Sequence, residues 1–148
     1  MVWVGVIVVG KVIKLECERM TQLTKNFSRA ELACKHCGEL HMPVADIDRL
    51  QRLRDKVGHV LIVSSAYRCP THNNAVSKTG RDGPHTKGAV DIAVSNVVEA
   101  FHLLVAAVAL GYTGIGVNLT GPLEKRFLHL DTLDDSPESP RPALWSYQ

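Results

Sequence analysis

The chain lacks any run of lysine and arginine residues. Its 17 basic and 15 acidic residues leave a formal net charge of only +2, which does not indicate a phosphate-backbone partner, so no nucleic acid is expected to bind. A long hydrophobic segment is also missing, because the apolar stretch that begins the chain is interrupted at Lys11. Stable membrane insertion is therefore not expected. No internal repeat or linker is visible, and 148 residues suffice for one domain.

The apolar N-terminal segment lacks the basic start and the small-residue cleavage site of a secretory signal. We interpret residues 1–19 as an extension, either an extra strand or sequence ahead of an alternative start at Met20. A signal peptide is the alternative interpretation. Residues 20–148 are expected to form the functional domain.

Cysteines are few, and the four present do not form a disulfide scaffold. Cys34 and Cys37 have the spacing of half a zinc site, but no second pair with this spacing follows. Cys69, together with Cys17 or His36, would have to complete such a site. A second metal site, a disulfide, and packed thiols in a tight turn all remain open.

Hydrophobic periodicity predicts helices and strands in mixed order. Helices are predicted at residues 29–37, 44–57, 72–76 and 97–110, and strands at residues 60–63, 89–94, 115–117 and 127–130. Since this order lacks regular βαβ alternation, we predict an α+β domain with a small, mostly antiparallel sheet and flanking helices. The tail, residues 134–148, is predicted to be an irregular strap pinned by Trp145 and Tyr147.

Two histidine–aspartate pairs lie where strands are predicted. His85 precedes Asp91 in GPHTKGAVD, and His129 precedes Asp131 in FLHLD. A catalytic zinc has three nitrogen or oxygen ligands and one open position. His85, Asp91 and His129 could supply that set, although structural histidine–aspartate hydrogen bonds would show the same pattern.

The general base of such a site has two candidates. Asp131 lies two residues after His129, so on a strand both point to the same face. Asp131 could then accept a proton from water, or it could orient His129 instead. Glu124 is the second-choice base. Arg68, at the end of a predicted strand, could bind a substrate carboxylate, stabilise an oxyanion, or form a surface salt bridge.

Three segments in order, SSAYRCPTHN, GPHTKGAVDI and RFLHLD, together resemble the zinc D-Ala-D-Ala carboxypeptidase-like peptidoglycan peptidases. That family includes phage endolysins and shares a fold with the zinc domain of hedgehog signalling proteins. The resemblance covers about residues 26–147. It implies zinc as the cofactor, with His85, Asp91 and His129 as its ligands. It also implies that Arg68, Tyr67 and Ser65 bind the substrate. Arg68 also resembles the arginine that stabilises the transition state.

The chain departs from the family pattern at three points. Gly83 replaces a serine, and Arg126 replaces a glutamate three residues before the last histidine, which directs the base assignment to Asp131. The interval from His85 to Asp91 is one residue short. If the missing residue belongs to the turn at Gly88, the turn can adjust and the ligand geometry is kept. If it belongs to the strand, Asp91 would point to the wrong face of the sheet.

The resemblance implies a zinc metallopeptidase that hydrolyses an amide bond in the stem peptide of peptidoglycan, as a carboxypeptidase or an endopeptidase. It further implies a monomer of bacterial or phage origin, acting in the cytoplasm or in the periplasm and cell wall. Two alternatives remain: a non-catalytic zinc-containing module that binds the cell wall, and a structural domain without zinc.

Overall fold

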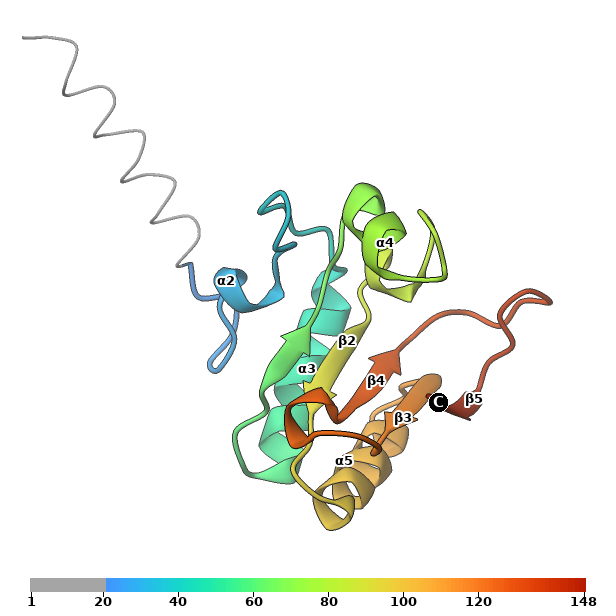
Figure 1. Ribbon diagram of the computed structural model, residues 1–148. Helices are drawn as coiled ribbons and strands as arrows, with labels where there is room; N and C mark the ends of the chain where they lie inside the picture. Colours follow the sequence, from blue (N-terminus) through green and yellow to red (C-terminus); the bar gives the residue numbers. More distant parts are fainter. Residues whose placement is uncertain (1–20) are drawn as a thin grey trace, which may run out of the picture.

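The computed structural model describes residues 21–148 (Figure 1). The predicted extension and Cys17 lie outside the described residues. The helices are α2 (Arg29–Leu32), α3 (Val44–Val57), α4 (Pro70–Val76) and α5 (Val97–Ala109), with 3₁₀ helices η1 (Pro84–Thr86) and η2 (Leu123–Lys125). The strands are β1 (Val63–Ser65), β2 (Val90–Ala93), β3 (Gly114–Asn118), β4 (Phe127–Asp131) and β5 (Ala143–Ser146). Within residues 21–148, no helix has the length and apolar composition needed to cross a bilayer.

The strands form one sheet of five, in the order β1-β2-β4-β3-β5. The β1–β2, β2–β4 and β3–β4 pairs are antiparallel, and only β3–β5 is parallel. The predicted α+β class with a mostly antiparallel sheet is therefore confirmed.

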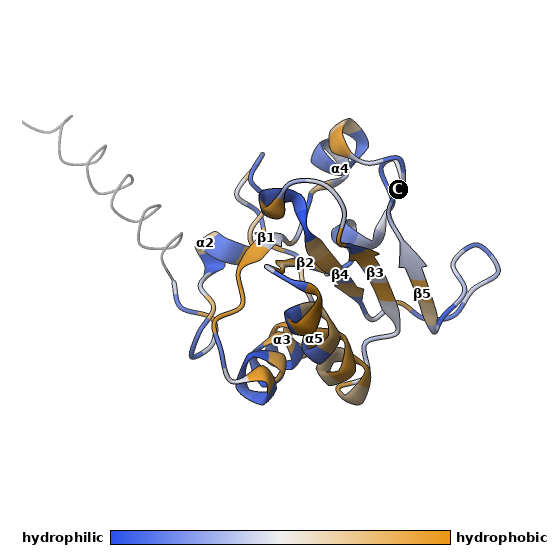
Figure 2. Cartoon of the chain, turned by 60° about the horizontal axis from the view of Figure 1, so that its bottom comes forward, coloured by the Kyte–Doolittle hydropathy of each residue, from blue (hydrophilic) through white to orange (hydrophobic). Residues whose placement is uncertain are grey.

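One face of the sheet is covered by helices. Figure 2 shows α3 and α5 side by side on this face, whereas α4 lies on the other side of the sheet. Ile92, Leu128 and Leu130 are fully buried in the core that the helices cover. Because successive strand residues point to opposite faces, Asp91 and His129 project from the other face.

Local sequence accounts for the helix boundaries. Ser28 and Glu31 form a capping box at the start of α2, and Gly58, with φ of 75°, ends α3. The Asn96 side chain accepts hydrogen bonds from two backbone N–H groups of the first turn of α5.

One predicted strand is wrong, and the prediction for the tail is wrong in part. Residues 60–63 are not a buried strand: Val60 and Ile62 are 69% and 65% exposed, and the strand begins only at Val63. The tail is not wholly irregular, because β5 pairs in parallel with β3. The apolar run at residues 60–63 did not indicate a strand, and the prolines of the tail did not exclude one, because pairing with distant strands decides which residues extend the sheet.

Candidate metal centre

The structure brings His85, Asp91 and His129 together. Asp91 on β2 and His129 on β4 are directly opposite cross-strand partners, and His85 approaches from η1. His129 Nδ1 lies 2.9 Å from Asp91 Oδ1, and His85 Nε2 lies 3.2 Å from the same oxygen. All three residues are buried, and their ligand atoms lie within 4.8 Å of one another.

The short interval between His85 and Asp91 is accommodated by the turn. Gly88 has φ of 115°, a conformation that L-residues with a side chain rarely adopt. β2 begins after this turn, at Val90, in a register that sets Asp91 opposite His129. The missing residue therefore does not reverse the strand faces.

His85 is oriented through its outer nitrogen. Its Nδ1 lies 2.7 Å from the Ala66 carbonyl oxygen, so Nδ1–H donates and Nε2 presents a lone pair toward Asp91. The Arg68 backbone N–H donates in turn to the His85 carbonyl at 3.0 Å. These two bonds fix both the ring and the backbone of η1 against the end of β1.

His129 is oriented by Asp131, which lies behind it. His129 Nε2 is 3.1 Å from Asp131 Oδ2. Arg141 binds both oxygens of this carboxylate, at 2.9 and 2.8 Å. A Cβ atom at Gly114 would collide with the Asp131 carboxylate, so the absence of a side chain there makes room for the ion pair.

The protons available do not satisfy the centre by themselves. A neutral imidazole carries one N–H, and the outer nitrogens of His85 and His129 use theirs on Ala66 and Asp131. The inner nitrogens then direct lone pairs at the Asp91 carboxylate, an acceptor facing two acceptors. Either a second proton on an imidazole or a bound cation resolves the conflict, and two imidazoles with one carboxylate are a donor set that zinc accepts.

The pKa shifts reflect this crowding. Burial raises the pKa of Asp91, but hydrogen bonds with His129 and His85 outweigh it and hold that pKa well below its usual range. Burial lowers the pKa of His129, whereas hydrogen bonds with Asp131 and Asp91 raise it, with a net increase. Both aspartates remain ionised at neutral pH, since hydrogen bonds with His129 and Arg141 also overcome burial in lowering the pKa of Asp131.

Arg68 lies beside the metal centre. Its guanidinium donates to Ser65 Oγ at 3.1 and 2.8 Å and reaches Asp91 Oδ2 at 3.5 Å. Ser65 is the cross-strand partner of Asp91, so it holds the arginine from the adjacent strand. Of the three predicted roles of Arg68, a surface salt bridge is the least consistent with this position.

The centre opens into a pocket of about 560 Å³. The residues that line it, besides the centre and Arg68, are Val76, Ser77, Lys78, Thr79, Pro84, Phe127, Trp145, Tyr147 and Gln148. One wall is therefore aromatic, and the other carries the loop after α4. Among the described residues that line this pocket, only Asp91 has a carboxylate side chain.

Neither predicted base lines the pocket. Asp131 is 2% exposed and occupied by His129 and Arg141, a geometry that fits the orienting role and not proton exchange with water. Glu124 is exposed on η2. Arg126, where the family pattern has glutamate, donates to the Gly121 carbonyl at 3.0 Å.

Tyr67, which was predicted to bind the substrate, also lies elsewhere. Its side chain is buried in the hydrophobic core and packs edge-on against His41, with ring centroids 5.4 Å apart. It does not line the pocket. Ser65 contributes through Arg68.

Sequence reasoning missed three residues of the site. Arg141 had no signal, since it is a single arginine in a proline-rich tail. Lys78 lies between the predicted elements and was given no role. Trp145 was predicted to pin the tail, and its ring lies 5.4 Å from that of His129; Gly116 makes this possible, because a Cβ there would approach the indole to 2.6 Å.

The substitution Asp131→Asn tests whether Asp131 orients His129 or transfers a proton. We expect the affinity for zinc at this centre to fall by about 10–100-fold, because the carboxylate that orients His129 loses its charge. Hydrolytic activity should then recover at saturating zinc. Activity titrated against free zinc measures this, and activity that stays low at saturation would restore Asp131 as the base.

A comparison with protein families finds one match. The family model described as Peptidase M15 matches residues 19–131, which contain the complete histidine–aspartate–histidine centre and Arg68 but not Arg141 or Trp145. Comparisons with curated proteins and with solved structures found no match.

Proposed function

The chain belongs to the Peptidase M15 family, and from this premise we propose that it is a zinc-dependent peptidase acting on the peptide stems of bacterial peptidoglycan. Family membership implies a metallopeptidase, and the family is zinc-dependent. The single observation that carries the proposal is the convergence of His85 Nε2, His129 Nδ1 and the Asp91 carboxylate at the floor of an open pocket.

These three residues would hold the zinc ion. When bound, zinc supplies a Lewis acid that polarises the scissile carbonyl and activates water. The Ala66 carbonyl and the Asp131 carboxylate keep the protons of both histidines on the outer nitrogens. The ligands are therefore preorganised, and the reaction does not have to reorient them.

Arg68 would act on the substrate. Ser65 holds its guanidinium at the wall of the pocket, where an N–H group can donate to the oxyanion that develops on the scissile carbonyl. The same fork could bind a substrate carboxylate. Lys78 adds a second cation to this pocket, which suits the anionic stem peptide of peptidoglycan.

Peptidoglycan digestion tests the function. Purified protein is incubated with peptidoglycan, and the products are identified by mass spectrometry with and without a chelator. We expect new peptide amines only when zinc is present, and the product masses will identify the bond that is cleaved. No amine release at any zinc concentration would contradict the proposal.

A non-catalytic module that binds the cell wall is the second candidate. The observation in its favour is that neither Asp131 nor Glu124 lines the pocket. This candidate predicts that the protein sediments with peptidoglycan and releases no amine. Its binding would depend on Arg68 and on the aromatic wall formed by Phe127, Trp145 and Tyr147.

A further inference from the structure

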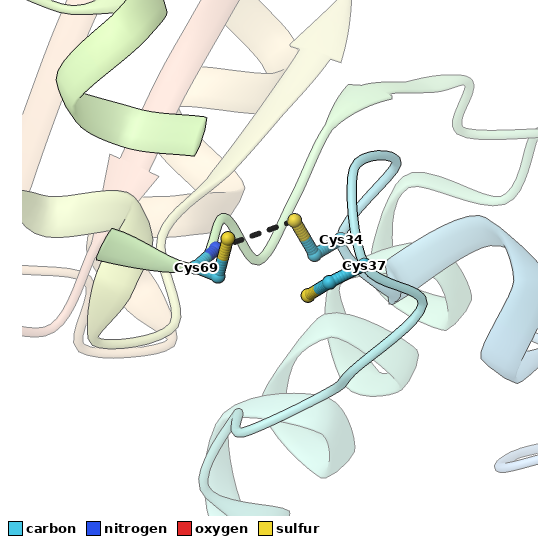
Figure 3. Close-up of side chains that lie close together, drawn as sticks. All are labelled: Cys34, Cys37 and Cys69. Atoms are coloured by element: carbon cyan, nitrogen blue, oxygen red, sulfur yellow. Dashed lines mark hydrogen bonds between the residues drawn. The ribbon is translucent and has the colours of Figure 1, made fainter. Parts of the chain in front are cut away.

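A second cluster of side chains that could hold a metal ion lies at the start of α4. Cys34, Cys37 and Cys69 have sulfur atoms within 4.8 Å of one another. Figure 3 shows Cys34 and Cys37 extending from one loop toward Cys69 at the start of α4. No disulfide joins these three cysteines, which are free. Zinc bound tetrahedrally at about 2.3 Å from each sulfur separates neighbouring sulfurs by about 3.8 Å, which this spacing accommodates.

His72 is a candidate for a fourth ligand. Its Nδ1 lies 3.4 Å from Cys34 Sγ. Cys69 is the N-cap of α4 and His72 is the third residue of that helix, so both side chains lie on the same side of its first turn. His36, the alternative from the sequence, is exposed, and its Nδ1 lies 3.6 Å from Cys69 Sγ.

We propose that Cys34, Cys37, Cys69 and His72 form a structural zinc site, separate from the centre in the pocket. The spacing agrees with this assignment: Cys34-Lys35-His36-Cys37 and Cys69-Pro70-Thr71-His72 are two ligand pairs, each with two intervening residues. The second pair was overlooked in the sequence because it ends in histidine.

The backbone around the cluster is arranged to hold thiolates. The Cys69 N–H donates to Cys34 Sγ at 3.3 Å, and the His72 N–H donates to Cys69 Sγ at 3.4 Å. Metals bind the thiolate form, so this backbone favours a cation at the sulfurs.

The loop geometry brings the ligands together. Gly38, with φ of 75°, reverses the chain directly after Cys37. The Gly38 N–H donates to the Cys34 carbonyl at 2.8 Å. A five-residue turn, residues 34–38, thus presents two sulfurs to the start of α4. Cys34 is 2% exposed and Cys37 is exposed, as for a site at the surface with one buried edge.

Such a site would connect two segments that are distant in sequence. The loop after α2 would be joined to the segment that carries Arg68, the residue directly before Cys69. The zinc would therefore stabilise the connection from which Arg68 enters the pocket. Closing a loop of this length with a metal removes conformational freedom from the unfolded chain.

Metal analysis of the purified full chain, prepared with zinc and a reductant, tests the site. We expect two zinc ions per chain in the unsubstituted protein, and one in Cys37→Ser and in His72→Ala. The matched control is His36→Ala, which should retain both. Cys37 is exposed, so its replacement should leave the core intact, as circular dichroism will show.

Cobalt substitution distinguishes the two sites. Cobalt bound to thiolates gives a charge-transfer band in the near ultraviolet, which we expect to persist in the double variant His85→Ala, His129→Ala and to disappear in Cys37→Ser. Alkylation of Cys37 should be slow with zinc and fast after chelation. If the unsubstituted protein holds a single zinc ion and Cys37→Ser retains it, the proposed site is wrong. A Cys34–Cys69 disulfide under the same reducing conditions would also overturn it. Zinc loss in His36→Ala but not in His72→Ala would overturn the assignment of His72.

Discussion

Replacing His129 with alanine is expected to abolish peptide hydrolysis while leaving a folded chain. His129 supplies one of the three inner ligand atoms, and without it His85 and Asp91 cannot hold zinc at a stable position. The substitution should also remove one zinc ion per chain. Amine release from peptidoglycan and metal content, measured on the same preparation, check this result.

The result has a matched control and a clear contrary outcome. His102, exposed on α5, can be replaced with alanine to show the effect of losing a histidine outside the pocket. That variant should keep its zinc and its activity. His85→Ala should behave as His129→Ala does, since both nitrogens face the same carboxylate. Wild-type activity in a metal-depleted His129→Ala protein would disprove the ligand assignment.

Replacing Arg68 with alanine is expected to lower kcat by about 10²–10³-fold, the usual cost of removing one donor to a developing oxyanion. Zinc content should not change, because Arg68 contacts Asp91 only at 3.5 Å. Steady-state kinetics on a defined stem peptide measure the effect. A rise in KM with constant kcat would instead assign Arg68 to the substrate carboxylate.

Two further variants make the Arg68 result specific. Arg68→Lys keeps the charge but loses the planar fork that contacts Ser65 twice, so we expect only partial recovery. Arg126→Ala is the control, because Arg126 donates to the Gly121 carbonyl and does not line the pocket. Equal losses in the Arg68 and Arg126 variants would show that the effect is structural.

The fold class and the clustering of His85, Asp91 and His129 could be predicted because each depends on a local pattern. Alternation along residues 127–131 places Leu128 and Leu130 toward the helices, and therefore His129 on the opposite face. The capping box at Ser28 and the glycine after α3 mark helix ends by backbone chemistry alone. Such signals require no knowledge of distant contacts.

The roles of individual polar residues could not be predicted in the same way. Asp131 and His129 share a strand face, and this fits either a base or an orienting residue. The difference comes from Arg141, ten positions further on, which occupies the carboxylate and excludes water. Tyr67 and Arg68 are adjacent, yet only packing after the end of β1 decides that Tyr67 enters the core.

By itself the sequence determined the layered α+β architecture and singled out His85, Asp91 and His129 as a set that could hold a metal, because spacing and alternation fix which side chains share a face. Only the tertiary structure decided that Asp131 lies behind His129, that Gly88 absorbs the short interval, and that Cys69 and His72 meet Cys34 and Cys37. Each of these depends on contacts between segments far apart in the chain, where the free energy of packing and ion pairing, and not local propensity, selects the arrangement.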